Sequence, residues 1–188
     1  MFIAENSSKN GTEELLWFAM SATFGRALKA KNYLESQKVE CFVPMKYEIF
    51  GGKEQKKSRQ LIPAISNLLF VHTTKEQIKT LKVGIGYLQY LTKPEGERNI
   101  PIIVPDEQMS QFMAVCNTLN EELVYLAPDE IDLEQGTPVR IIGSIFDGIE
   151  GTFVKVKKSR KKRVVVMVQG IAAVMLAEFT DGYLQVLK

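Results

Sequence analysis

Few residues of this chain are of a type and in a setting that would support catalysis. The only histidine, His72, ends an apolar run, where a lone histidine is more often structural than catalytic. No serine or cysteine has a recognisable nucleophile context. The two cysteines, Cys41 and Cys116, lie among apolar residues and are typical of small core side chains. We therefore expect no catalytic residue, no metal ion and no cofactor.

The motifs of nucleotide-binding enzymes are missing as well. The stretch VGIGYL over 83–88 contains G-x-G but lacks the third glycine and the following helix of a dinucleotide-binding loop. The acidic pair at 129–130 lies in an acid-rich stretch, where carboxylates are usually solvated. The sequence thus predicts a binding protein and not an enzyme.

Clustered basic side chains are the remaining pattern with a chemical meaning. Seven basic residues and no acid occur over 155–163, and a second basic group occupies 53–59. Such groups attract nucleic-acid backbones, because each neutralised phosphate releases a counterion. The formal net charge is only +2, however, and charge runs of this kind are also typical of solvated loops and hairpin turns.

The composition is that of an ordinary globular protein. Of the 188 residues, 45% are hydrophobic and 24% are charged. No apolar stretch approaches the roughly 18–20 residues of a membrane helix. The first residues also lack the basic end and apolar core of a secretory signal. We expect a cytoplasmic protein that does not contact the membrane.

Apolar periodicity predicts a mixture of strands and helices in the first part of the chain. The expected strands lie at 15–23, 41–50, 67–73 and 87–92, and the expected helices at 25–38 and 74–82. A third helix is expected to begin at Asp106 as its cap. Its apolar stripe at helical spacing consists of Met109, Phe112, Met113, Cys116 and Leu119. This pattern predicts an α+β protein whose N-terminal part is an α/β sandwich.

The pattern changes after the third helix. Residues 120–133 are acidic and contain a proline, which predicts a linker. Five short apolar runs follow, separated by glycine or charged turns, and they indicate a small SH3-like β-barrel over 134–188. We therefore expect a flexible tail over 1–13 and a first domain over 14–119, followed by the linker and the barrel.

A glycine-rich turn identifies a motif in the expected barrel. Gly143, Phe146, Gly148 and Gly151 stand between two strand candidates, where glycine permits positive φ and a close backbone approach. The stretch VRIIGSIFDGIEGTFVKVKKSRKKRVVVMV resembles a KOW motif, with a strand, a glycine turn, a second strand, a basic turn and a third strand. KOW motifs also occur in ribosomal proteins, so this motif alone does not fix the function.

The first domain resembles the N-terminal domain of the NusG transcription elongation factors, most closely the specialised paralogs of RfaH and UpxY type. The resemblance rests on an opening strand with Trp17, a helix, the stretch VECFVPMKYEIF, a basic loop and the segment PAISNLLFV over 63–71. In the family this last segment reads approximately Pro-Leu-Phe-Pro-Asn-Tyr-Leu-Phe-Val. The identical positions are Pro63, Asn67, Leu69, Phe70 and Val71. The resemblance covers about residues 15–188, domain order included.

The resemblance implies a transcription elongation or antitermination factor. In such proteins the first domain docks on the clamp helices of the RNA polymerase β′ subunit and suppresses pausing. The KOW barrel recruits a further partner, such as a ribosomal protein or a termination factor. Factors of UpxY type act as antiterminators of surface-polysaccharide operons. We expect a monomer that contacts the polymerase and also non-template or upstream DNA.

The resemblance also assigns site residues. Ile65, Leu68 and Phe70 match the polymerase-facing aromatic positions of the family, although two of the three are aliphatic here. Burial of aliphatic side chains still favours docking, by about 25 cal/mol per Å² of apolar surface. The implied nucleic-acid contacts lie on the first helix and in the basic loop. They are Arg26, Lys29, Lys31, Lys53, Lys56, Lys57 and Arg59.

An alternative function uses the barrel alone. A general RNA-binding or ribosome-associated KOW protein would bind mainly through the basic turn over 155–163. A polymerase-binding factor instead needs an exposed apolar patch on the first domain, which monomers rarely carry without a partner. The two functions therefore predict different dominant surfaces.

Overall fold

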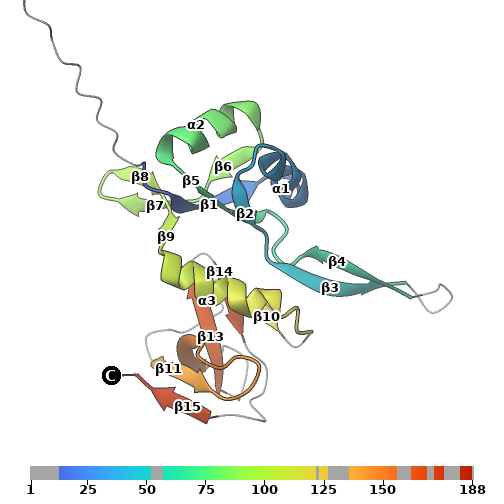
Figure 1. Ribbon diagram of the computed structural model, residues 1–188, viewed down its shortest axis with the longest axis vertical. Coiled ribbons are helices and arrows are strands. Elements are labelled where there is room, and N and C mark those ends of the chain that lie inside the picture. Colours follow the sequence, from blue (N-terminus) through green and yellow to red (C-terminus); the bar gives the residue numbers. More distant parts are fainter. Residues whose placement is uncertain are drawn as a thin grey trace, which may run out of the picture.

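The protein combines a mixed α/β N-terminal region with an all-antiparallel C-terminal sheet (Figure 1). The computed structural model describes residues 13–51, 57–121, 123–126, 136–155, 162–168, 172–175 and 183–187. This architecture confirms the α+β class expected from the sequence. The expected tail lies outside the described residues up to residue 12.

The N-terminal sheet is built around one central strand. Strand β1 (Leu16–Ala22) pairs antiparallel with β5 (Leu68–Thr73), β6 (Leu88–Tyr90) and β9 (Ile103–Val104), and β5 also pairs with β2 (Glu40–Phe42). Every residue of β5 except His72 is buried. A strand buried on both faces reads as a continuous apolar run, and this is why 67–73 was recognisable in the sequence.

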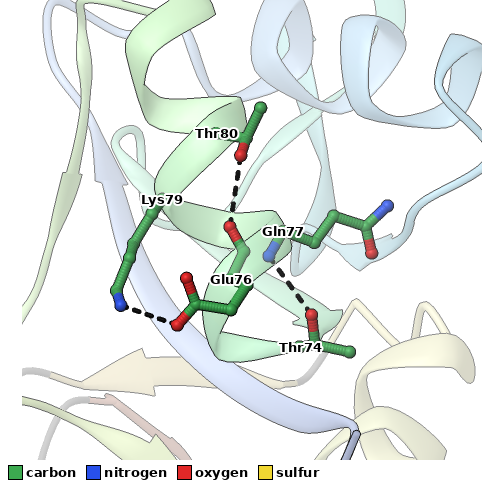
Figure 2. Close-up of polar contacts among 5 residues, drawn as sticks. All are labelled: Thr74, Glu76, Gln77, Lys79 and Thr80. Atoms are coloured by element: carbon green, nitrogen blue, oxygen red, sulfur yellow. Dashed lines mark hydrogen bonds and ion pairs between the residues drawn. The ribbon is translucent and has the colours of Figure 1, made fainter. Parts of the chain in front are cut away.

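Two helices cover one face of this sheet (Figure 1). They are α1 (Ala27–Ser36) and α2 (Lys75–Gly84). Helix α2 begins where Thr74 Oγ1 accepts a hydrogen bond from the Gln77 N–H group at 3.2 Å, and Lys79 pairs with Glu76 in its first turn (Figure 2). A side-chain cap of this kind satisfies a backbone donor that the helix leaves unpaired, so it fixes where α2 starts.

Helix α3 (Asp106–Asn117) covers the opposite face. Met109, Phe112 and Cys116 of the predicted stripe are buried. The N-cap is Pro105 and not Asp106, which corrects the expected start of this helix by one residue. Asp106 lies in the first turn, where a negative charge interacts favourably with the helix dipole.

Two hairpins extend from the N-terminal sheet (Figure 1). Strands β3 (Met45–Phe50) and β4 (Ser58–Pro63) form one, and β7 (Thr92–Glu95) and β8 (Arg98–Pro101) form the other. The single strand expected over 41–50 is thus two strands, β2 and β3, with a break at residues 43–44. The end of the expected basic loop belongs to β4.

The C-terminal region is a six-stranded antiparallel sheet in the order β10-β14-β13-β12-β11-β15. All five strands expected from the sequence are present, which confirms the all-β character of this region. Their bounds are β11 (Thr137–Ile142), β12 (Glu150–Lys155), β13 (Lys162–Val168), β14 (Ala172–Met175) and β15 (Tyr183–Val186). The sixth, β10 (Val124–Leu126), lies inside the stretch expected to be a linker and pairs with β14.

Helix α3 contacts both sheets (Figure 1). One apolar cluster contains Phe70 of β5, Phe112 of α3 and Val166 of β13. The Gln111 side chain accepts a hydrogen bond from the Glu150 N–H group at 3.2 Å. The described part of the chain therefore has a continuous core through α3.

Candidate functional site

An apolar pocket opens where β1 ends and β5 begins. Its volume is about 350 Å³. It is lined by Ser21, Ile65, Asn67, Leu68, Leu91, Thr92 and Ile102. Four of these side chains are aliphatic and none is charged, so the pocket suits an apolar side chain of another molecule. Two of the three docking residues expected from the sequence, Ile65 and Leu68, therefore meet in one concave surface.

The third expected docking residue, Phe70, belongs to the core and not to this surface. It is 0% exposed and does not line the pocket. Its ring lies edge-on to Phe112, with ring centres 5.9 Å apart, and Phe112 makes a similar contact with Phe42 at 6.3 Å. Leu68 and Phe70 face the same side of β5 because they are two residues apart. Phe70 is thus placed to support the pocket from the core.

Asn67 fixes the wall of the pocket and was not singled out in the sequence. Its carbonyl accepts a hydrogen bond from the Ala22 N–H group, and its Oδ1 accepts one from Gly25 N–H, each at 2.8 Å. Next to it, the Leu68 N–H group donates to the Ile65 carbonyl at 3.2 Å and closes a tight turn. The sequence signal for this role was that Asn67 is identical to the residue at this position of the family segment.

The basic residues of α1 have different surroundings. The Arg26 guanidinium lies 5.2 Å from the centre of the Phe24 ring and 5.0 Å from that of Tyr87. Lys29 lies 5.9 Å from the Tyr87 ring, whereas Lys31 pairs with Glu35 at 3.7 Å. Arg26 and Lys29 thus belong to an aromatic surface, and Lys31 belongs to an ordinary helix-face ion pair.

The basic residues of the β3–β4 hairpin are only partly described. Arg59 lies 3.7 Å from the ring of Tyr47 and forms an ion pair with Glu121. Lys57 is exposed, and Lys53 and Lys56 lie outside the described residues. Because Glu121 offsets its charge, Arg59 is less available to a phosphate than its sequence context predicts.

The glycine turn of the KOW motif adopts the backbone that its sequence requires. Gly143 and Gly148 have φ values of +77° and +81°. The Gly148 N–H group donates to the Ile141 carbonyl at 2.9 Å, which closes the turn between β11 and β12. Phe146 packs against the core, and a Cβ at Gly151 would lie 2.8 Å from the Val165 carbonyl oxygen. Most of the basic turn over 155–163 lies outside the described residues.

Burial disfavours the thiolate form of both cysteines. Burial raises the pKa of the Cys116 thiol to about 12. Burial also raises the pKa of Cys41 to about 11. The described residues contain no group of three or more histidine, cysteine or acidic side chains placed to hold a metal ion. Of the helices in the described ranges, none has the length and apolar character needed to cross a membrane.

Comparison with known proteins agrees with the resemblance in the sequence. The family model described as transcription termination factor NusG matches residues 15–113. A solved structure of Thermotoga maritima NusG, from work on its domain interaction, is 18% identical, with a TM-score of 0.44. The match covers 87% of this chain and 94% of the other. No curated protein matches the chain. The family match, over more than half of the chain, shows that it belongs to the NusG family of non-enzymatic transcription factors, which implies binding to RNA polymerase.

Proposed function

We propose that this protein is a transcription elongation and antitermination factor that docks on the β′ clamp helices of RNA polymerase through the pocket at Ile65 and Leu68. Docking there suppresses pausing or termination on particular operons, such as surface-polysaccharide loci, as in the RfaH and UpxY types. The observation that carries this proposal is an open, uncharged pocket on the domain matched by the family model. Such a pocket is the surface that a polymerase-binding factor needs.

The chemistry of the pocket fits the tip of a helical hairpin. Ile65, Leu91 and Ile102 present aliphatic groups, and Ser21 and Thr92 supply hydroxyl groups at the same surface. An apolar anchor that enters such a site gains burial energy, while the hydroxyls can satisfy polar groups at its rim. Phe70 and Phe112 are fully buried and belong to the same apolar cluster as Leu68 of the pocket.

The C-terminal sheet completes the proposed function by recruiting a second partner. We assign this role to the region that carries Gly143, Phe146, Gly148 and Gly151, and the partner is a ribosomal protein or a termination factor. We propose that the protein acts in the cytoplasm as a monomer. Its contacts with non-template or upstream DNA are proposed to involve the basic residues of α1 and of the β3–β4 hairpin.

A substitution that introduces a charged side chain at position 65 tests the docking site. Ile65→Glu should lower the affinity for core RNA polymerase by about tenfold or more, because docking would bury an unpaired carboxylate. Ile65→Phe restores an aromatic side chain of the family type and should bind at least as well as wild type. Val83→Glu is the matched control, because Val83 is 88% exposed on α2 and lies outside the pocket.

The measurement is surface-immobilised binding of the full chain to core polymerase, with circular dichroism to confirm folding. Normal polymerase binding by a folded Ile65→Glu variant would contradict the docking site. Substitution of Lys157, Lys158, Lys161 and Lys162 by alanine should leave polymerase binding intact. Loss of polymerase binding in this variant would instead support the alternative function, in which the basic turn over 155–163 dominates binding.

A further inference from the structure

A hairpin is inserted into the edge of the N-terminal sheet beside the docking pocket. Strands β6 and β9 pair with the same edge of β1, and only Ala19 lies between their partners Met20 and Phe18. The Leu91 N–H group donates to the Ala19 carbonyl at 2.9 Å, and the Ala19 N–H group donates to the Ile102 carbonyl at 3.1 Å. The Ile102 N–H group donates in turn to the Leu91 carbonyl at 2.9 Å. Strands β6 and β9 thus form one interrupted edge strand, and the β7–β8 hairpin leaves it at Leu91 and returns at Ile102 (Figure 1).

The base of this hairpin is also part of the pocket wall. Leu91, Thr92 and Ile102 line the pocket. Strands β7 and β8 have four residues each. At the rise of a β-strand, the hairpin therefore extends about 13 Å beyond its base. A molecule that places an apolar anchor in the pocket has this hairpin at its side.

The hairpin is largely exposed. All four residues of β7 are exposed, and so are Arg98 and Asn99 of β8. A two-stranded hairpin without further packing is marginally stable in water. Pro94 of β7 and Pro101 of β8 lack the N–H group that a strand ladder needs, which disfavours the addition of a further strand. The hairpin is therefore suited to contact another molecule through its side chains.

The alternation of side chains shows which residues continue the surface of the pocket. Leu91 lies opposite Ile102, and the next pair on the same face is Lys93 opposite Ile100. Ile100 is half-buried and extends the apolar surface of the pocket. Lys93 is exposed and places a cation beside it.

The charge of Lys93 has no acid directly opposite. Glu95 and Arg98 follow on the same face and lie opposite each other, where unlike charges attract. Within the described part of the chain, the ion pairs do not include Lys93. Lys93 is therefore the cation that a carboxylate next to the pocket would meet first.

We propose that the β7–β8 hairpin is a second contact of the docking site, in which Lys93 pairs with a carboxylate of the polymerase segment whose apolar anchor fills the pocket. Ile100 packs against the same segment beside the anchor. This inference rests on the docking proposed above and adds the chemistry of the polymerase segment, an apolar side chain next to an acidic one.

The surroundings of Lys93 favour a protein segment as its partner. An apolar centre with a charged rim is the usual arrangement of a protein interface, and here the pocket is the centre and Lys93 the rim. A nucleic acid would meet Lys93 but has no aliphatic anchor for the pocket beside it. A charge at the rim acts mainly on the association rate and on its salt dependence.

A charge reversal at Lys93 tests the proposed pairing. Lys93→Glu should weaken binding of the full chain to core polymerase roughly three- to tenfold, because an attraction at the rim becomes a repulsion. Most of the loss should appear in the association rate, and the affinity should fall less steeply with salt than that of wild type. Lys93→Arg keeps the charge and should bind like wild type. Lys75→Glu is the matched control and should change neither property, because Lys75 is exposed on α2, which covers the opposite face of the sheet.

Removal of the hairpin tests the surface as a whole. Replacement of residues 93–100 by Asn-Gly joins Thr92 to Pro101 through a two-residue turn of the kind that hairpins favour. The three hydrogen bonds at the base of the hairpin remain possible, so this variant should keep the far-ultraviolet circular dichroism of wild type. It should lose at least as much polymerase affinity as Lys93→Glu. Ile100→Ser should show a smaller loss, mainly in the dissociation rate.

The measurement is surface-immobilised binding to core polymerase at low and at physiological salt, without nucleic acid. Wild-type affinity of the folded, shortened hairpin would overturn the inference. So would a loss in Lys93→Glu no larger than that in Lys75→Glu, or tighter binding by Lys93→Glu.

Ile65→Glu, measured alongside, separates this inference from the docking proposal. Loss of binding in Ile65→Glu together with normal binding of both hairpin variants would contradict the hairpin contact alone. Normal binding by Ile65→Glu would contradict the docking site itself.

Discussion

Phe112 shows how a single side chain connects the core with the candidate site. Its ring contacts Phe42 and Phe70 at 6.3 Å and 5.9 Å between centres, and the apolar cluster that they share also contains Leu68 of the docking pocket. The residue is fully buried on α3 and belongs to the same apolar cluster as Val166 of the C-terminal sheet. A substitution of Phe112 should therefore alter the packing of α3 against both sheets.

Phe112→Ala should lower the free energy of unfolding by about 3–5 kcal/mol, because it removes a buried ring and leaves a cavity. Urea unfolding followed by far-ultraviolet circular dichroism measures this loss. Val83→Ala is the control and should change stability by less than about 0.5 kcal/mol, because Val83 is exposed. A loss below about 1 kcal/mol for Phe112→Ala would mean that α3 does not pack as described.

The thiols provide a second test at this scale. The pKa of Cys116 is raised to about 12 and that of Cys41 to about 11, in both cases mainly by burial. Because the thiolate is the reactive form, native Cys41→Ser protein should react with a disulfide reagent at a rate that still increases tenfold per pH unit above pH 9. An unperturbed thiol, with a pKa of about 8.5, would instead level off.

The same shift predicts the direction of a stability change. The unfolded state loses the Cys116 proton at a lower pH than the native state does. The free energy of unfolding should therefore fall as the pH rises above about 8.5. Urea titrations of wild type and Cys116→Ala at pH 8 and pH 10 measure this difference. A Cys116 thiol that reacts at pH 8 as fast in native protein as in urea would contradict its burial.

At the residue scale, the sequence predicted burial best where apolar residues recur at helical spacing. It placed Met109, Phe112 and Cys116 on a buried stripe, and the structure confirms this. It did not single out Phe24, because exposed aromatic residues carry no periodic signal. It also gave Ile65, Leu68 and Phe70 one role, whereas only Ile65 and Leu68 line the pocket. Whether a side chain of β5 lines the pocket depends on the packing behind it, and Phe70 packs against Phe112 of α3.

Among the elements, most of those buried on at least one face were predicted and most exposed hairpin strands were not. The exceptions are the exposed strand β3, which lay within the predicted 41–50, and the two-residue strand β9, which was missed. All three helices and the five expected C-terminal strands are present. The hairpin strands β4 and β7 are largely exposed, so they lack the apolar alternation that marks a strand. Strand β10 lies in an acidic stretch, and its place follows from pairing with β14, a contact that a local pattern does not encode.

The pairing of β12 with β13 gives a prediction for an element. Gly151 allows β12 to approach β13 closely, since a Cβ there would lie 2.8 Å from the Val165 carbonyl oxygen and 2.9 Å from Val164 Cγ1. Gly151→Ala should lower stability by roughly 1–3 kcal/mol through overpacking. Hydrogen exchange should show faster exchange of the β12 and β13 amides. Gly86→Ala is the control, because a Cβ there meets nothing within 4 Å. Unchanged exchange in Gly151→Ala would contradict the close approach.

At the scale of the whole molecule, the sequence predicted two folded regions in the right order but not the contact between them. Helix α3 belongs to the N-terminal region in sequence and packs against β13 and β14 as well. The linker over 120–133 was predicted from its acidic composition, and composition carries no information about the pairing of β10 with β14. The family match over 15–113 supports the identity of the first region, and the proposed recruitment role belongs to the second.

The most direct test of the central claim is in vitro transcription on a pausing template, with and without the protein. We predict that wild type shortens the lifetime of the paused complex. We also predict that Ile65→Glu loses this effect and that Val83→Glu retains it. An unchanged or lengthened pause in the presence of wild-type protein that is demonstrably bound to the polymerase would contradict an elongation and antitermination function.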